Sequence, residues 1–219
     1  MIRGFVDGSS EVNAEEGHLL LTDMVALLGH TGDFKKKLAE MDTTIEAHPA
    51  FEPLYDYLFD LLMLSFIASD SAQIDENYLE SEEWLQIEDE TSDRGSEMLN
   101  MYIYLTEAAT QDIEIDLMDF LNEFLLADDE LYQDDFFVYE EIIKNEEIAD
   151  ADIHEILATA EHIQTEELAE IYVPLLSIFD VQDTEEEIRA AIKKSAYQRG
   201  SHLALYNALR AFASGLEEA

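Results

Sequence analysis

Seven carboxylates and no base lie within the seventeen residues 125–141, where they alternate with Leu, Phe, Val and Tyr. Charged side chains must stay in water while apolar ones need a core, so such a segment folds only if its elements each bury one face. On a helix, a like-charged pair four residues apart costs only about 0.2–0.5 kcal/mol. Burial contributes about 25 cal/mol per Å² of apolar surface. We therefore expect amphipathic helices whose carboxylates lie opposite an apolar stripe.

The charge is distributed unevenly along the chain. Residues 38–143 contain thirty acids and one base, Arg94, whereas residues 188–216 contain five bases and no acid. We predict an acidic helical body over 1–183 and a basic C-terminal helical segment over 184–219 that packs on it. The net charge of −41 repels nucleic acid and anionic lipid, so it argues against direct nucleic-acid or membrane binding and favours a cationic partner.

Composition and apolar spacing predict an all-α fold, a bundle of about nine or ten helices with no strand. Only three Pro and eight Gly interrupt the chain, and 47% of its residues are hydrophobic. The apolar window 54–68 is too short to span a bilayer and predicts a buried core helix, with Pro53 at its first position. The expected helices are 13–32, 33–48, 53–69, 75–90, 94–110, 113–125, 133–145, 150–163, 165–180 and 184–213.

Caps and breakers define several of these boundaries. Residues 13–16 and 184–187 both have the capping-box pattern of a helix start. Residues 113–117 alternate like a strand, but helical spacing follows them and a helix is the preferred interpretation. Pro174 is expected to kink or split its helix, and Gly200 to interrupt the last one.

No catalytic signature stands out in the sequence. The chain has no Cys, which excludes disulfides, thiol nucleophiles and thiolate metal sites. It contains no nucleophile elbow, no phosphate-binding glycine loop and no recognisable Ser/His/Asp arrangement, so we predict a protein that is not an enzyme. Residues 1–12 lack the hydrophobic stretch of a signal peptide, and a cytoplasmic location is expected.

Two segments, 66–80 and 125–141, share a layout. Each ends an apolar helix on Ala, turns through an acid, places one aliphatic residue and then opens an acidic helix. This repeat resembles the TerB-type domain of tellurite-resistance clusters, an all-helical fold, over about residues 54–165. The glycine of the family's turn is replaced by Ser71 in one copy and by Asp129 in the other.

The resemblance implies that acids around these two turns bind a hard divalent cation, Ca²⁺ or Mg²⁺, weakly. The candidate ligands are Asp70, Asp75, Glu76, Asp128, Asp134 and Asp135. Neither turn has the central Gly and alternating oxygen ligands of an EF-hand, so loose condensation is favoured over a dedicated site and no cofactor is predicted. His154, Glu161 and His162 share one helix face, but the Glu-x-x-His pairs of di-iron bundles are missing.

The favoured hypothesis is a non-enzymatic binding protein whose carboxylate-rich helical face engages a basic protein. Carboxylates at i and i+4 stand about 6 Å apart on a helix, which resembles the charge spacing of a nucleic-acid backbone. Such a face would mimic DNA and inhibit a nucleic-acid-binding protein, or serve as an immunity-type protein against a basic nuclease. The predicted partner-binding residues are Asp112, Glu114, Asp116, Asp119, Glu123, Asp128, Asp129, Glu130, Asp134 and Asp135.

Two alternatives stay open. One is a TerB-like stress or metal-response domain whose acidic turns bind a divalent cation weakly and change the affinity for a partner. The other is a salt-adapted helical scaffold, in which the acids serve solubility. The basic segment near the C-terminus argues mildly against this second alternative, because salt adaptation spreads acids over the whole surface.

Overall fold

The computed structural model is built from helices, and no strand occurs among the residues it describes. These residues are 2–8, 14–29, 34–70, 81–91, 94–125, 133–144, 148, 151–180, 182–195 and 199–217. The all-α prediction is confirmed, with twelve α-helices and one 3-10 helix in the described ranges. Contacts divide the chain into a small unit, Glu11–Tyr102, and a large unit formed by Met1–Ser10 with Ile103–Ala219.

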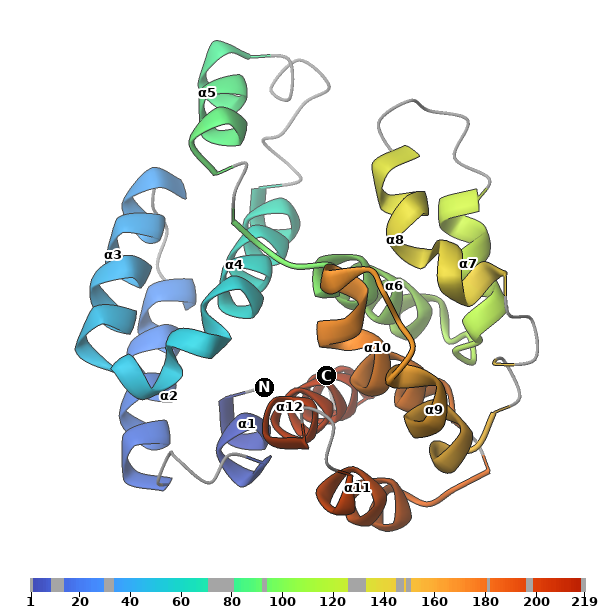
Figure 1. Cartoon of the computed structure of the whole chain (residues 1–219). Helices are drawn as coiled ribbons and strands as arrows, with labels where there is room; N and C mark the ends of the chain where they lie inside the picture. Colours follow the sequence, from blue (N-terminus) through green and yellow to red (C-terminus); the bar gives the residue numbers. More distant parts are fainter. Residues whose placement is uncertain are drawn as a thin grey trace. The chain divides into compact units, whose positions relative to one another are not determined.

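The helices follow most of the expected ranges, with shifts of a few residues at their ends. In chain order they are α1 (Ile2–Gly8), α2 (Ala14–Gly29), α3 (Phe34–Ala47), the 3-10 helix η1 (Pro49–Leu54), α4 (Tyr55–Asp70), α5 (Glu82–Thr91), α6 (Met98–Gln111), α7 (Leu117–Leu125), α8 (Gln133–Ile143), α9 (Ile153–Ala160), α10 (Glu166–Phe179), α11 (Glu185–Lys194) and α12 (Arg199–Glu217) (Figure 1).

The small unit is held together by the apolar faces of α2 to α5. Leu20, Met24 and Leu27 recur at helical spacing on α2 and are all buried. Aromatic rings link the other helices: the ring centroid of Phe34 lies 5.1 Å from that of Phe66, which in turn stacks on Trp84 at 6.0 Å. Burial of these rings therefore joins α3, α4 and α5.

Asp60, in the middle of α4, is a carboxyl group with only 1% of its surface exposed. It accepts hydrogen bonds from the backbone N–H of Ser96 at 3.0 Å and from the Ser96 hydroxyl at 2.6 Å. The neighbouring Gly95 has φ 95°, and a Cβ there would lie 2.9 Å from Oδ1 of Asp60, so this approach requires glycine. Burial raises the pKa of Asp60 to about 7, against the lowering effect of the hydrogen bonds from Ser96.

The large unit is organised around α10. Nine consecutive residues, 171–179, are buried in it, so this helix is surrounded by other elements on every side. Its N-terminus is capped from α8, because the Glu141 carboxylate accepts hydrogen bonds from the backbone N–H of Thr165 at 2.9 Å and from its hydroxyl at 2.8 Å. One carboxylate of the acidic stretch therefore has a structural role.

The two ends of the chain meet within the large unit, where α1 lies along α12 (Figure 1). A Cβ on Gly4 of α1 would fall 2.1 Å from the carbonyl oxygen of Asn207 on α12, so only glycine permits this approach. Ile2 and Phe5 are buried beside it. The sequence-based expectations did not include α1, because seven residues are too few to show a helical period.

Pro174 does not split its helix, since α10 runs unbroken from Glu166 to Phe179. Proline removes the N–H that would bond the carbonyl four residues earlier, here that of Glu170. The fully buried imidazole of His202, on α12, hydrogen-bonds the backbone at Ala169 and Glu170, with its Nε2 3.1 Å from the Ala169 oxygen. A side chain from another helix thus bonds the α10 backbone one turn before Pro174.

Several other expectations differ from the structure. Residues 113–116 form a non-helical connection, and α7 begins only at Leu117. Gly200 lies in the first turn of α12 rather than at a break, because α11 has already ended at Lys194. Pro53 lies inside η1 instead of opening α4. The capping box over 184–187 is confirmed, with the Thr184 hydroxyl accepting from the backbone N–H of Glu187.

The boundary predicted between residues 183 and 184 does not coincide with the division into compact units. Residues 184–219 belong to the large unit together with 103–183, and α12 packs against α1 and α10. The predicted boundary followed net charge, whereas the units follow apolar contacts. The observed division falls instead within α6, after Tyr102.

We expect Asp60 to make the small unit less stable as the pH rises. The folded state keeps the carboxyl proton up to about pH 7, whereas the ordinary pKa of this group is 3.8. Between pH 5 and pH 8 the wild type should therefore lose about 2–3 kcal/mol of unfolding free energy relative to Asp60→Asn. The fluorescence of Trp84, the single Trp of the chain, follows this transition in urea. Asp56→Asn, an exposed acid one turn away, is the control; equal losses in wild type and Asp60→Asn would contradict the assignment.

We expect His202 to have the opposite effect at lower pH. Burial lowers its pKa from 6.5 to about 4, so the unfolded chain binds this proton first as the pH falls. The wild type should lose about 2–3 kcal/mol between pH 6.5 and pH 4.5 relative to His202→Gln, which keeps a neutral donor. Urea unfolding followed by far-ultraviolet circular dichroism measures this. The control is the exposed His154→Gln, and a loss of the same size in His202→Gln would show that this imidazole is not responsible.

Candidate partner-binding surface

Four of the predicted partner-binding residues lie together in the large unit. Asp112, Glu114 and Asp116 stand on the connection between α6 and α7, and Asp119 follows in the first turn of α7 (Figure 1). All four side chains are exposed. We call residues 112–119 the acidic loop.

The acidic loop begins with a Schellman motif at the end of α6. The backbone N–H of Ile113 donates to the carbonyl of Ala108 at 2.9 Å, and that of Asp112 to the carbonyl of Ala109 at 3.4 Å. Asp112 has φ 55°, in the left-handed region where glycine usually stands. Aspartate adopts this conformation at lower cost than most residues, because its short polar side chain bonds locally.

The middle of the acidic loop is held by a buried phenol. The Tyr104 hydroxyl accepts a hydrogen bond from the backbone N–H of Asp116 at 2.8 Å and donates one to its carbonyl oxygen at 3.0 Å. The Asp116 carboxylate in turn accepts from the backbone N–H groups of Met118 at 2.8 Å and Asp119 at 3.1 Å, as an N-cap of α7 does. Both ends of the loop are therefore fixed by hydrogen bonds.

Ile113 is an apolar residue in the acidic loop that remains 52% exposed. It borders two hollows of the large unit. The larger, of about 670 Å³, lies between α6, the loop and α12, and the smaller, of about 280 Å³, lies between α6 and α7. Asp112 and Glu114 line the larger hollow with Ile113, and Asp119 lines the smaller one. An exposed apolar side chain beside hollows with polar residues at their rim is a common feature of protein-binding surfaces.

Two of the described bases of the C-terminal segment pair elsewhere than with the acidic loop. Among the described residues, the loop carboxylates form no ion pair. Arg189 and Arg210 both form ion pairs with Glu185 at the start of α11, with N···O distances of 2.8 Å and 2.5 Å. The hydrogen bond from Arg210 is the main reason why the pKa of Glu185 is lowered. The loop therefore keeps its negative charge.

Exposed carboxylates are not restricted to the acidic loop. Glu88 and Asp89 are exposed on α5 in the small unit, and Glu166 and Glu167 on α10 in the large one. Negative charge by itself thus does not single out one surface. In the acidic loop, Asp112 and Glu114 line the larger hollow and Asp119 the smaller one, and the exposed Ile113 borders both.

The other predicted site residues lie outside what the structure describes. Residues 75, 76 and 128–130 fall in gaps between the described ranges. Glu123, Asp134, Asp135 and Asp70 lie within α7, α8 and α4, but their side chains are not described. The TerB resemblance, which depends on these turns, remains a prediction.

No group of three or more His, Asp or Glu side chains within the described ranges could hold a metal ion. His154 is exposed on α9, and the Nδ1 atom of His162 lies 3.2 Å from the carbonyl oxygen of Ala158, within its own turn. The metal ligands predicted at the two acidic turns stay a prediction. Every helix of the described ranges is too short or too polar to cross a lipid bilayer.

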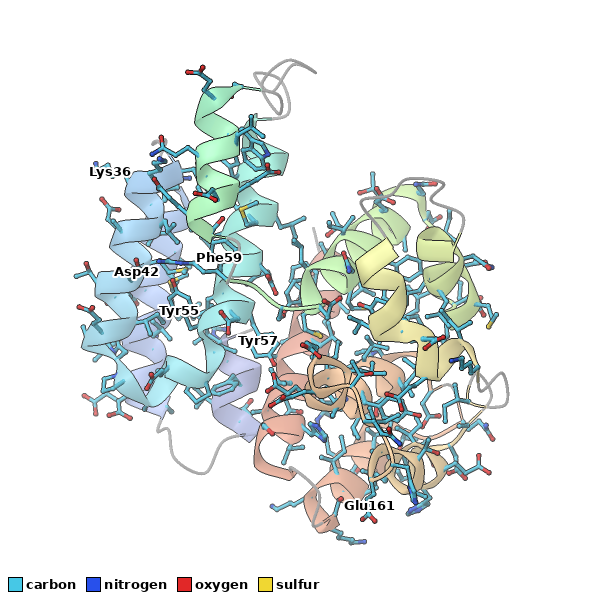
Figure 2. The ribbon with its side chains drawn as sticks, turned by 45° about the horizontal axis from the view of Figure 1, so that its top comes forward. Lys36, Asp42, Tyr55, Tyr57, Phe59 and Glu161 are labelled. Carbon is cyan, nitrogen blue, oxygen red and sulfur yellow. The ribbon has the colours of Figure 1, made fainter. Side chains whose placement is uncertain are left out.

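A further hollow, of about 600 Å³, lies in the small unit and is lined by residues of α3, η1 and α4. Asp42 and Tyr55 meet at its wall, where the Tyr55 hydroxyl donates to the Asp42 carboxylate at 2.6 Å (Figure 2). Nη1 of Arg94 lies 3.1 Å from the same Asp42 oxygen, and its guanidinium lies over the Tyr55 ring. The single base of the stretch 38–143 therefore has an internal role.

Sequence reasoning missed the residues that shape the acidic loop. Tyr104 lies twelve residues from the backbone atoms that it binds, and nothing near it in the sequence signals this contact. In the sequence, Ile113 fits an apolar position of a helix or a strand, and nothing in the pattern indicates that its side chain is exposed. Arg94 stands out in the sequence as the lone base among thirty acids, but it pairs with Asp42 in the small unit and is not part of the acidic loop.

Comparison of the chain with protein-family models, with curated proteins and with solved structures found no significant match.

The conformation of Asp112 leads to a prediction on stability. Glycine has no Cβ to oppose φ 55°, so Asp112→Gly should stabilise the large unit by about 0.5–1 kcal/mol. Ala109→Gly, three residues earlier within α6, should instead destabilise it by about 1 kcal/mol. Thermal unfolding of both variants measures this difference. If both substitutions destabilise equally, Asp112 does not occupy a left-handed C-cap.

Proposed function

We propose that this chain is a non-enzymatic binding protein whose acidic loop engages a basic protein at the surface which that protein uses for nucleic acid. The observation that supports this most directly is the group of four exposed carboxylates on either side of the exposed Ile113 along the chain, without ion pairs among the described residues. In this role the chain is a DNA-mimic inhibitor or an immunity-type protein for a basic nuclease.

The electrostatics favour such a partner. With 52 acids and 11 bases, the whole chain attracts cations and repels polyanions. Long-range attraction speeds diffusional encounter with a basic surface, and the rate then falls steeply as salt is added. Nucleic acid and the acidic loop would therefore compete for the same cationic residues of the partner.

The fixed geometry of the acidic loop also favours binding. Hydrogen bonds to Tyr104 and the Schellman motif hold the backbone before a partner arrives. A surface that is already ordered loses less conformational entropy on association than a flexible one. The carboxylates at 112, 114, 116 and 119 are thus presented at set positions rather than on a disordered tail.

The proposal predicts that charge at the acidic loop, rather than total charge, determines binding. The loop variant combines Asp112→Asn, Glu114→Gln, Asp116→Asn and Asp119→Asn; asparagine at 116 keeps an N-cap. The control variant makes the same change in net charge at exposed positions of α10 and of the turn after α9: Glu161→Gln, Glu166→Gln, Glu167→Gln and Glu170→Gln. Wild type and control should retain one basic nucleic-acid-binding protein from the native cell at moderate salt, and the loop variant should lose it.

The recovered protein is then purified and its association rate is measured against salt. The loop variant should associate about tenfold more slowly at low salt, with a shallower salt dependence, and duplex DNA should compete with the wild type. Equal retention by loop and control variants, or no competition by DNA, would refute the proposal. Melting in millimolar Ca²⁺ against an ionic-strength-matched sodium control tests the metal-response alternative, which requires a specific rise with Ca²⁺.

A further inference from the structure

Seven of the ten residues that line the larger hollow beside Ile113 are apolar. Leu105 and Ala109 of α6 form one side, Ala213 and Leu216 of α12 the other, and Ile113 borders it from the acidic loop. Its volume of about 670 Å³ lies within the range of clefts that accept ligands. More than one apolar side chain of a partner can therefore enter it.

The side of the hollow formed by the acidic loop carries negative charge. Asp112 and Glu114 line the same hollow, and both are exposed. Arg210 also lines it, but its guanidinium Nε donates to the Glu185 carboxylate at 3.0 Å, and its Nη2 bonds the same oxygen. The charge left for a partner is negative, which selects cationic residues next to the apolar ones.

We infer that the hollow between α6 and α12 receives the apolar side chains of a basic amphipathic segment of the partner, whose Lys or Arg side chains lie against Asp112 and Glu114. The inference rests on the proposed function and specifies the kind of partner element. An amphipathic helix placed in a groove presents apolar anchors at helical spacing and charges beside them, which fits this combination. Part of the binding free energy would then persist at high salt, because salt screens charge interactions but does not screen apolar burial.

Three synthetic peptides of about 14 residues, roughly four helical turns, probe the site. The first has Leu at helical spacing and Lys elsewhere, the second replaces each Leu by Ser, and the third keeps Leu but replaces each Lys by Glu. The Lys/Leu peptide should bind the wild type at least about tenfold more tightly than the Lys/Ser peptide at about 0.15 M salt. The Glu/Leu peptide should not bind measurably.

Two variants alter the hollow without changing charge. Ala109→Gln and Ala213→Gln place an amide in it from opposite walls, and each should reduce the advantage of Leu over Ser to below about threefold. Ala158→Gln, at an exposed alanine of α9, is the control and should leave the advantage unchanged. Two independent variants protect the test against a folding defect in one of them, and circular dichroism checks both.

The outcomes separate the inference from the proposed function. Equal binding of the Lys/Leu and Lys/Ser peptides, together with loss in the loop variant, would overturn the inference and leave the proposed function standing. Equal binding of Lys peptides to wild type and loop variant would overturn both. Binding of the Glu/Leu peptide would remove the requirement for a basic segment. Self-association of the wild type that Ala109→Gln abolishes, measured by sedimentation, would show that a second copy occupies the hollow.

Discussion

Apolar burial has to hold together a chain in which acids outnumber bases by 52 to 11. Because so few cations are present, neutralisation cannot stabilise the interior, and the helices must each direct a nonpolar face inward. The large unit shows this most clearly in α10, which is buried over residues 171–179. Asp60 and His202 are two of the polar side chains buried within the described ranges, and both have hydrogen-bond partners.

Several of the few bases form ion pairs with nearby carboxylates. They therefore do little to reduce the negative electrostatic potential outside the molecule. Arg94 pairs with Asp42 in the small unit, while Arg189 and Arg210 pair with Glu185 in the large one. Partly exposed pairs of this kind add little stability, but they fix the positions of neighbouring helices. Most carboxylates are left without a cation, so the surface remains strongly negative and its potential reaches about a Debye length into solution.

The acidic loop combines three properties that favour binding. Its backbone is fixed, by Tyr104 and by the caps of α6 and α7; its carboxylates are exposed; and Ile113 stands out beside two hollows. Charge attracts a partner from a distance, whereas apolar contact and rigid geometry determine how tightly it is held. The proposed binding role follows from finding all three within residues 112–119.

The sequence by itself determined the all-α class, most helix ranges, the cap at Thr184 and the strong negative charge, because periodicity, capping and composition are local properties. It also grouped Asp112, Glu114, Asp116 and Asp119, which the structure places, exposed, between α6 and the first turn of α7. Only the tertiary structure decided that α1 packs on α12, that Pro174 is tolerated in α10 and that Ile113 is exposed. Those outcomes depend on contacts between residues far apart in the chain, such as Gly4 with Asn207, which no local pattern records.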